Sequence, residues 1–473
     1  MSGRSSQRVD PSLRFLQWGL CAVVVLAPLP FGSVIPAGRL ALELAAYALL
    51  VVWGLRGRSL TQAAPGRVQI VGLFLLLGLA TLQIVSVGST IVGWIAPRTA
   101  SVRVAAQPPA EIAMAETKAL GVDALQTTQP TTLSMDPAAT ASALRTGGAY
   151  AALWCVALTV GATLGFRRIA LAFLLSAAAQ SVYGIVVLAS GIDRIWNVPK
   201  RAYLDAATGT FVNKNHFAGY LTIALTCAVG WFLRDLLKRR RRGPGISGFL
   251  GRGGSRHLWY GLLVALGGCG LMLSMSRAGI AVTLPALTWV VWRAYRESGR
   301  RRIWIGVVAF LLVVGFVFVP LGSARLIDRY AESDEIFAHD GGRLQVWSDS
   351  LTMAGELPWT GSGFGTFATA FPLFRSPEVR LFYIHAHNDY VQALAEGGLL
   401  GLLGFLLFLG PLFLAAYDGL SGRHGLLACG AAAGVLAAAA HAIVDFNFHI
   451  PANAAAVAVV AGALQGLRCK NRS

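Results

Sequence analysis

Long apolar blocks separated by polar joins constrain the fold of this chain more than any other feature of its sequence. A helix rises 1.5 Å per residue, so about 20 apolar residues are enough to cross roughly 30 Å of hydrocarbon. We therefore predict an all-α polytopic membrane protein with about 12 transmembrane helices and a large, partly helical outer loop between helices 9 and 10. The blocks lie at about residues 15–34, 40–55, 68–88, 148–166, 169–190, 217–233, 258–275, 278–292, 303–321, 390–416, 425–444 and 451–467.

The scarcity of charge excludes the main soluble classes of protein. Asp, Glu, Lys and Arg make up 13% of the 473 residues, and 55% are hydrophobic, whereas soluble domains carry about 25% charged residues. An ordinary cytosolic enzyme, a disordered scaffold and a disulfide-stapled secreted domain are therefore excluded. Five of the six cysteines fall within predicted spans and the predicted outer loops contain none, so we expect no disulfide or thiolate metal site there.

One apolar stretch, residues 258–292, is too long for a single span. A helix of these 35 residues would be about 52 Å long. Clusters of Arg and Lys stand on both sides of it, from Arg234 to Arg256 and from Arg293 to Arg302. Because positive charge gathers on the cytoplasmic side, both flanks are expected there. The stretch is predicted to be a hairpin of two spans, with Arg277 at its outer turn.

The same rule orients the whole chain. With twelve spans and both termini cytoplasmic, most of the 40 Lys and Arg fall in inner joins, and most of the 22 Asp and Glu fall on the outer side. The net charge of +18 is thus a topology signal, and we expect no nucleic acid partner. The first apolar block is long and no small-residue cleavage site ends it, so we predict a retained span rather than a signal peptide.

Two predicted outer loops are long and differ in character. The first is rich in Ala, Thr, Pro and Ser and is predicted to be poorly ordered, whereas the second carries charged, aromatic and His residues and is predicted to be a folded cap. Within the cap, a short amphipathic helix is expected to follow Asp340. The predicted parts are 1–88 with helices 1–3, the loop 89–147, 148–321 with helices 4–9 and basic inner loops, the cap loop 322–389, and 390–473 with helices 10–12 and an inner tail.

A glycine-rich run in the second loop, Gly361-Ser-Gly363-Phe-Gly365-Thr366, has some likeness to a nucleotide-binding loop. It lacks the Lys of a P-loop and the strand context of a dinucleotide fold. We therefore predict a tight glycine turn and no nucleotide partner.

Polar side chains gather where the predicted spans reach the outer side. Ionisable groups at membrane depth are costly and usually face a cavity or one another, so these residues are candidates for a functional site. The i, i+4, i+8 spacing of His441, Asp445 and His449 fits either a structural hydrogen-bond network or a chemical role. The whole set is Lys200, Arg201, Lys214, Asn215, His216, Arg277, His385, His387, Asn388, Asp389, His441, Asp445 and His449.

A metal site is the alternative for the two histidines of the cap. His385 and His387 would point to one side of an extended segment, which permits metal binding. With neither an HExxH motif nor paired carboxylates nearby, we predict no metal. We expect no cofactor.

Four elements, taken in order, resemble those of the O-antigen ligase and polysaccharide polymerase superfamily. The fourth matches the ligase signature of His-Asn, nine residues and Gly-x-x-Gly position by position. The first departs from the family, which usually has a basic residue close before the glycine, where Ala206 and Ala207 stand here. The elements are Gly209-Thr-Phe-Val-Asn213-Lys-Asn215-His216-Phe-Ala-Gly219, then Ser274-Met-Ser276-Arg277-Ala-Gly279, then the loop with Arg343, Trp347, Gly361 and Gly363, and finally His387-Asn388 with Gly398 and Gly401.

The resemblance implies a metal-independent glycosyltransferase of the GT-C class in the inner membrane of a bacterium. In that family, a glycan on undecaprenyl diphosphate is transferred on the periplasmic side to an acceptor hydroxyl. The acceptor is lipid A core for ligases and another lipid-linked glycan for polymerases. The implied partners are therefore this lipid-linked donor, a glycan or lipid A core acceptor, and the bilayer. The choice between ligase and polymerase stays open.

The chemistry of such a transfer assigns roles to the candidate residues. Displacing a diphosphate requires positive charge where negative charge grows, which Arg277 and one of Lys214 or Arg201 can supply. The acceptor hydroxyl must lose a proton, and neutral His387 is the candidate base, with Asp389 or Asp445 as an orienting or alternative partner. The remaining candidates for substrate binding are Asn215, His216, Arg343, His385, Asn388 and His449.

A transporter or flippase is the competing class, because it would also place charged residues along a path. Transporters often show related halves and polar groups near the midplane. Here no internal repeat is visible and the polar residues gather toward one face, which favours the glycosyltransferase.

Overall fold

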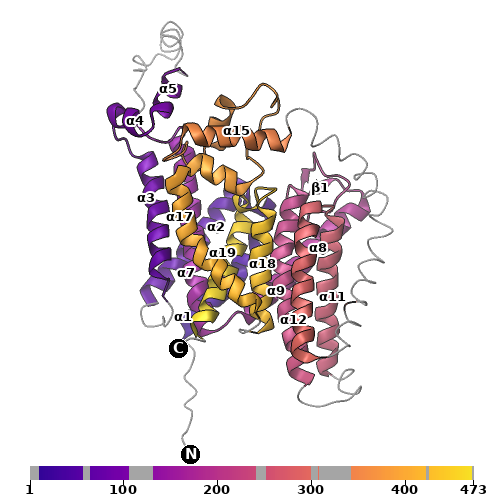
Figure 1. Cartoon of the computed structure of the whole chain (residues 1–473). Coiled ribbons are helices and arrows are strands. Elements are labelled where there is room, and N and C mark those ends of the chain that lie inside the picture. The colour runs from indigo at the N-terminus through magenta and orange to yellow at the C-terminus, as the bar shows by residue number, and fades with distance from the viewer. Residues whose placement is uncertain are drawn as a thin grey trace, which may run out of the picture. The chain divides into compact units, whose positions relative to one another are not determined.

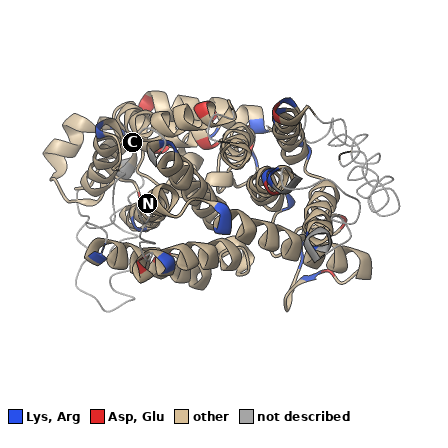
Figure 2. Ribbon diagram, turned by 90° about the horizontal axis from the view of Figure 1, so that it is seen from below, with Lys and Arg blue, Asp and Glu red and all other residues tan. Residues whose placement is uncertain are grey.

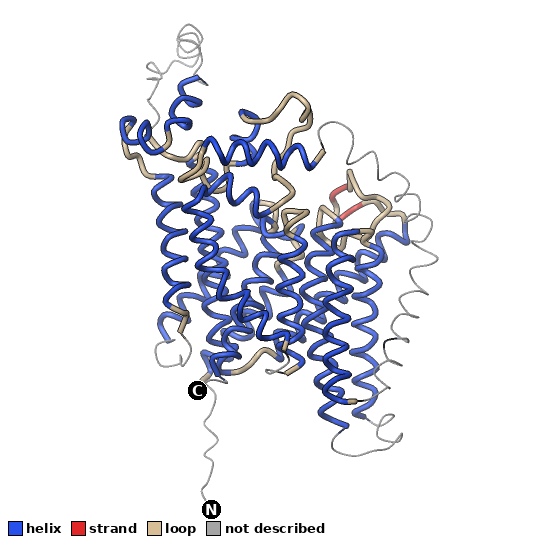
Figure 3. The backbone as a smooth tube through the Cα atoms, in the orientation of Figure 1, coloured by secondary structure: helices blue, strands red, loops and turns tan. Residues whose placement is uncertain are grey.

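The structure, a computed structural model, describes residues 10–56, 64–105, 131–240, 252–299, 307, 342–421 and 425–470. In these residues helices dominate, and the strands β1 (Arg194–Ile195) and β2 (Val198–Pro199) form a short antiparallel pair (Figure 3). The prediction of an all-α polytopic membrane protein is confirmed.

Eight helices in the described part of the chain are long and apolar enough to cross a membrane. They are α2 (Pro36–Arg56), α3 (Arg67–Ile84), α7 (Pro137–Thr163), α8 (Arg167–Ser190), α9 (Lys214–Arg240), α11 (Arg252–Leu273), α17 (Asp389–Leu420) and α19 (Pro451–Lys470).

Three further helices coincide with predicted spans without meeting these criteria of length and hydropathy. The apolar helices α1 (Pro11–Leu26) and α18 (Leu426–His441) are shorter, and α12 (Arg277–Ser298) carries several charges near its end. The predicted span at 303–321 lies outside the described residues, so the number of twelve stays a prediction.

The chain packs as two compact bodies. The first body contains residues 1–65, 149–332 and 411–473, and the second contains residues 66–148 and 333–410. Helices α7 and α17 contribute residues to both.

Helix α9 forms the centre of the first body (Figure 1). Nearly all of it is buried, and it packs against α8, α11, α12, α18 and α19. Small residues permit this packing: a Cβ added to Gly230 would lie 2.6 Å from the carbonyl oxygen of Leu426, and one added to Gly430 would lie 2.3 Å from that of Thr226. Close approach of backbones at small residues is a usual way for membrane helices to associate.

Helices α9 and α12 run in the same direction. The hydroxyls of Thr222 and Thr283 are 2.6 Å apart, and Gly279 packs against Ala218 one turn earlier on both helices. Both pairs are separated by 61 residues, so Arg277 stands at the level of His216. The starts of both helices therefore lie at the same end of the first body.

The predicted hairpin at residues 258–292 is confirmed. Helix α11 ends at Leu273, and Ser274, Met275 and Ser276 form the turn that precedes Arg277. The Ser276 hydroxyl accepts a hydrogen bond from Gly279 N, which caps α12, and the Ser274 hydroxyl accepts one from Ser276 N. Met275 has a left-handed backbone, with φ of +53°. The two serines thus fix the direction in which α12 leaves the turn.

Basic residues mark the other end of the first body. Arg167 and Arg168 begin α8, and Arg293 and Arg296 lie in the last turns of α12. An ion pair joins Arg468, near the end of α19, to Asp418. Most of the ribbon in Figure 2 carries no charge.

The second body contains α3, α4 (Ser89–Ile95), α5 (Pro97–Ala105), α15 (Arg343–Glu356), α16 (Phe367–Ala370), the 3₁₀ helix η3 (Phe371–Leu373) and parts of α7 and α17. Part of the predicted loop 89–147 is therefore helical, and its residues 106–130 lie outside the described residues.

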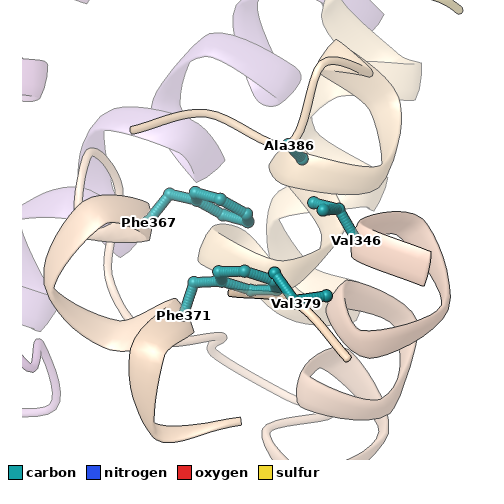
Figure 4. Close-up of a cluster of buried hydrophobic side chains, with 5 residues drawn as sticks. All are labelled: Val346, Phe367, Phe371, Val379 and Ala386. Atoms are coloured by element: carbon teal, nitrogen blue, oxygen red, sulfur yellow. The ribbon is translucent and has the colours of Figure 1, made fainter. Parts of the chain in front are cut away.

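The expected amphipathic helix of the cap is α15. Asp340, expected at its start, lies outside the described residues, and the N-cap position is held by Gly342, which has no side chain. Val346 of α15 packs with Phe367, Phe371, Val379 and Ala386 in a buried apolar cluster (Figure 4). This cluster fixes the segment that carries the two histidines of the cap against α15 and α16.

The remaining short elements of the described chain belong to the first body. They are the 3₁₀ helices η1 (Phe31–Ser33) and η4 (Asn447–His449).

Candidate functional site

The loop before α9 is buried and tied to its neighbours. The Gln180 side chain accepts a hydrogen bond from Thr210 N, and the Thr210 hydroxyl donates to the Pro28 carbonyl at 2.6 Å. Ala207 N donates to the Leu273 carbonyl at the end of α11. Ala206 and Ala207 are 0% and 1% exposed. A basic side chain at either position of this fold would be buried.

Three basic residues near this loop have different surroundings. Lys200 donates from Nζ to the Ala206 carbonyl at 3.1 Å, and burial lowers its pKa although Asp193 and Asp205 oppose the shift. Arg201 is exposed. Lys214 is half-buried, with its ammonium 5.5 Å from the centre of the Tyr203 ring. Lys214 therefore stands at the start of α9, whereas Lys200 stabilises the loop through its hydrogen bond to the Ala206 carbonyl.

Asn213 caps the start of α9. Its side-chain oxygen accepts from Asn215 N at 2.8 Å, and its carbonyl accepts from Phe217 N. Lys214 and Asn215 are the first two residues of the helix. The positive end of the helix dipole and the Lys214 ammonium therefore act at the same place.

Arg277 has a similar position as the first residue of α12. It is half-buried, and the cap at Ser276 sets its direction. Because Arg277 lies at the level of His216 on the neighbouring helix, the starts of α9 and α12 bring a guanidinium and an ammonium to one end of the first body. The arrangement suits an anion with several oxygens.

His216 and Asp445 form a buried pair in the first body. Their Nε2 and Oδ1 atoms are 3.7 Å apart, and the side chains are 7% and 1% exposed. Phe446 packs edge-on against the His216 ring. The expected single stripe with His441 and His449 is not formed, because α18 ends at His441 and His449 lies in η4. The prediction of one helical face from the i, i+4, i+8 spacing is wrong, because the helix ends at His441 and the chain turns before His449.

Two asparagines that sequence reasoning missed complete this buried group. Asn453 donates from Nδ2 to the His216 carbonyl and to Asn447 Oδ1, both at 2.9 Å. A Cβ on Gly219 would lie 2.2 Å from Asn447 Oδ1, so only glycine fits there. The group fixes the loop between α18 and α19 against α9, which is a structural role for His216 and Asp445. In the sequence, Asn447 and Asn453 could have been noticed as polar residues close to Pro451, which starts α19.

In the second body, Asn388 caps α17. Its side-chain oxygen accepts from Tyr390 N at 3.0 Å and from Val391 N at 3.1 Å, and its carbonyl accepts from Gln392 N. Asp389, which is buried, is the first residue of the helix. The His-Asn signature thus combines a histidine with the helix cap that follows it.

Replacing Asn388 with alanine is expected to destabilise the second body by about 1 kcal/mol, because two backbone N–H groups lose their acceptor. Asn388→Asp keeps the acceptor and is expected to stay near wild type. Thermal unfolding of the purified protein in detergent measures both. Equal stability of Asn388→Ala and wild type would contradict the capping role.

The two histidines of the cap lie just before this helix. His387 has a left-handed backbone, with φ of +55°, and its ring meets Tyr383 edge-on. The indole N–H of Trp347 donates to the Ala386 carbonyl at 2.9 Å. The Nδ1 atom of His385 is 3.2 Å from Gln392 Nε2. Both imidazoles are half-buried and belong to one rigidly held segment.

Arg343 is the first residue of α15 and is half-buried. Six residues later, the buried Asp349 accepts hydrogen bonds from the Gln345 side chain and from the backbone and hydroxyl of Ser376. Asp349 therefore ties α15 to the segment beyond η3.

The predicted glycine turn is confirmed, and it encloses a carboxylate that sequence reasoning missed. Glu396 accepts hydrogen bonds from Gly365 N at 2.8 Å and from Phe367 N at 3.0 Å. Gly363 N donates to the Glu396 carbonyl. Gln392 and Glu396 stand four residues apart in an apolar span. Because polar and ionisable residues are rare in such spans, they could have been picked out from the sequence as functional candidates.

The glycines of the signature allow this contact. Gly398 interrupts α17 with φ of +59°, and a Cβ there would lie 2.6 Å from the carbonyl carbon and oxygen of Trp359. Leu399 N and Leu400 N donate instead to the carbonyls of Pro358 and Trp359. The segment that precedes the glycine turn therefore packs against α17 at the point where the helix is interrupted.

Gly398→Ala is expected to destabilise the second body by several kcal/mol, because the added carbon meets backbone and the conformation is left-handed. Gly410→Ala in the same helix is the control. It meets nothing within 4 Å and is expected to be neutral or slightly stabilising. Thermal unfolding and yield of folded protein distinguish the two, and similar behaviour of both variants would contradict the steric role.

The structure divides the candidate residues between the two bodies. Arg201, Lys214, Asn215, His216, Arg277, Asp445 and His449 lie in the first body, and Arg343, His385, His387, Asn388 and Asp389 lie in the second. Within the described residues, no group of three or more His, Cys, Asp and Glu side chains could hold a metal ion.

The fold and these residues define a class: a multi-pass helical membrane protein with cationic helix starts and a histidine segment that leads into the helix cap Asn388. Residues 262–406 match the family model described as O-antigen ligase. The matched part carries α11, α12 and α15 to α17, hence Arg277 and the His387-Asn388 signature, and it confirms the resemblance to the O-antigen ligase and polymerase superfamily. It supports an enzyme of that general type. No curated protein shows a significant match to the chain.

Proposed function

We propose that the protein is a glycosyltransferase that moves a glycan from undecaprenyl diphosphate to an acceptor hydroxyl on the periplasmic side of the bacterial inner membrane. The observation that carries the proposal is the O-antigen ligase match, which includes both the Arg277 turn and the His387-Asn388 signature. The acceptor is a second lipid-linked glycan in a polymerase or lipid A core in a ligase.

Arg277 and Lys214 are proposed to bind the diphosphate of the donor. As the bond between the anomeric carbon and the diphosphate oxygen breaks, negative charge grows on the leaving group, and fixed cations stabilise it. The backbone N–H groups at the starts of α9 and α12 also carry positive partial charge, which favours an anion at these helix ends. Lys214 is the better candidate for the second cation than Arg201, because it is half-buried at a capped helix start.

His387 is proposed to take the proton of the acceptor hydroxyl while that oxygen bonds to the anomeric carbon. Asp389 follows on the same helix start, and Arg343, His385 and Asn388 line the same cap. In this assignment His216 and Asp445 act indirectly, since their buried pair holds the start of α9 in place, and His449 stays a candidate for substrate binding.

The proposed orientation has both termini in the cytoplasm and the histidine segment in the periplasm. For the first body, a periplasmic Arg277 is supported by Arg167, Arg168, Arg293 and Arg296, which lie at the opposite end of that body. The proposed parts of the chain are those predicted from the sequence, with 322–389 as the periplasmic cap.

A transfer assay tests the proposal. Purified protein in nanodiscs is given undecaprenyl-diphosphate oligosaccharides with EDTA, and glycan length and released undecaprenyl diphosphate are measured. A ladder of longer lipid-linked glycans identifies a polymerase, and product only with added lipid A core identifies a ligase. Turnover is expected to persist in EDTA, because the proposed cations are side chains. Folded protein that releases no lipid diphosphate with any acceptor would refute the proposal and favour transport.

A further inference from the structure

The side chain of Gln392 has a fixed orientation in the second body. It is 1% exposed, and its Oε1 accepts a hydrogen bond from Ala386 N at 3.1 Å. A backbone N–H can only donate, so the atom facing it must be the oxygen of the amide. The Nε2 atom then faces Glu396 Oε1 at 3.0 Å, and this carboxyl oxygen accepts its hydrogen bond. Both contacts require the same orientation.

Glu396 is itself held in place. It is 3% exposed, and the glycine turn directs the N–H groups of Gly365 and Phe367 at its two oxygens. Three N–H groups in total, two from the turn and one from Gln392, donate to its oxygens. The anchor for Gln392 is therefore an acceptor with a fixed position.

The second proton of Gln392 Nε2 is left to face His385. The two nitrogens, Gln392 Nε2 and His385 Nδ1, are 3.2 Å apart. Because Gln392 donates there, His385 Nδ1 must accept, and an accepting imidazole nitrogen carries no proton. The neutral His385 ring then carries its proton on Nε2.

We propose that Gln392, anchored by Glu396, is a positioning residue that fixes His385 as the Nε2–H tautomer, so that His385 donates a hydrogen bond to a substrate oxygen and His387 alone serves as base. The inference rests on the proposed transfer reaction for its functional part only. His385 Nε2 carries a proton and its Nδ1 lone pair is engaged by Gln392, so the ring cannot take the hydroxyl proton without breaking that contact.

The tautomer is tested first, without substrate, by ¹⁵N NMR of protein labelled at histidine. His385→Gln assigns the resonance. At a pH well above the ordinary imidazole pKa of about 6.5, His385 is expected to show an unprotonated Nδ1 and a protonated Nε2. A protonated Nδ1 in the wild-type protein overturns the proposal.

An exchange of the two side chains, Gln392→Glu with Glu396→Gln, keeps the charge but places an acceptor beside His385. It is expected to move the proton of His385 to Nδ1. The control is the matching exchange Gln345→Glu with Asp349→Asn, which alters a similar contact elsewhere in the cap and is expected to leave the tautomer unchanged. A folded exchange variant with the original tautomer refutes the proposal. If that variant does not fold, the wild-type spectrum decides alone.

The functional part is tested in the transfer assay with two variants of His385. Glutamine carries an N–H donor where Nε2 stands, so His385→Gln is expected to keep turnover within about tenfold of wild type, whereas His385→Ala loses roughly 10²- to 10³-fold. Equal losses in both variants overturn the donor role. A wild-type protein that transfers no glycan refutes the proposed function and leaves the tautomer result intact.

Discussion

His387→Gly is expected to lower glycan transfer by roughly 10²- to 10⁴-fold, because it removes the proposed acceptor of the hydroxyl proton. Glycine suits the left-handed backbone of this position, so the segment keeps its path while the imidazole is removed. Turnover is measured by the release of undecaprenyl diphosphate, and folding by thermal unfolding.

Added imidazole provides the control for this variant. A small base diffusing into the space of the missing ring is expected to restore part of the turnover of His387→Gly and to leave Arg277→Ala unchanged. Asparagine, which also tolerates a left-handed backbone, is expected to give a folded protein that stays inactive. Turnover of His387→Gly within a few-fold of wild type would show that His387 is not the base.

Arg277→Ala is expected to lower kcat/KM for the lipid-linked donor by roughly 10²- to 10³-fold, because a fixed cation no longer meets the charge that grows on the diphosphate. Inhibition by free undecaprenyl diphosphate is expected to weaken as well. Arg277→Lys keeps the positive charge but cannot form a bidentate contact with phosphate oxygens, so an intermediate loss of kcat/KM is expected.

Arg296 provides a matched control on the same helix. It is exposed near the opposite end of α12, where its guanidinium lies 5.7 Å from the centre of the Trp292 ring. Arg296→Ala removes the same charge and is expected to leave donor kinetics unchanged. If both variants lose activity equally, net charge or stability is responsible, and Arg277 has no specific role at the diphosphate.

The helices could be predicted from the sequence, because hydropathy reports directly on the length of an apolar block. Eleven predicted spans coincide with helices of the described chain, including the α11–α12 hairpin, where the basic flanks decided the assignment. The position of Arg277 followed from the same reasoning. The family signature also predicted which residues gather before α17.

The roles of particular side chains could not be predicted, because they depend on contacts between distant parts of the chain. Asn453 donates to the His216 carbonyl across 237 residues, which periodicity does not reveal. The spacing of His441, Asp445 and His449 indicated one helical face, but the helix ends at the first of them. In the sequence, Gln392 and Glu396 are visible only as polar residues in an apolar block. Their contacts depend on a glycine turn some thirty residues earlier, which donates hydrogen bonds to Glu396.

The left-handed backbone at His387 also limits which substitutions can be interpreted at this position. Few residues other than glycine and asparagine adopt such a conformation at low cost, so most single substitutions there disturb the cap as well as the chemistry. A substitution at this position therefore reports on the imidazole alone only when the new residue is glycine or asparagine. Other replacements mix a loss of the cap's local structure with any loss of chemistry.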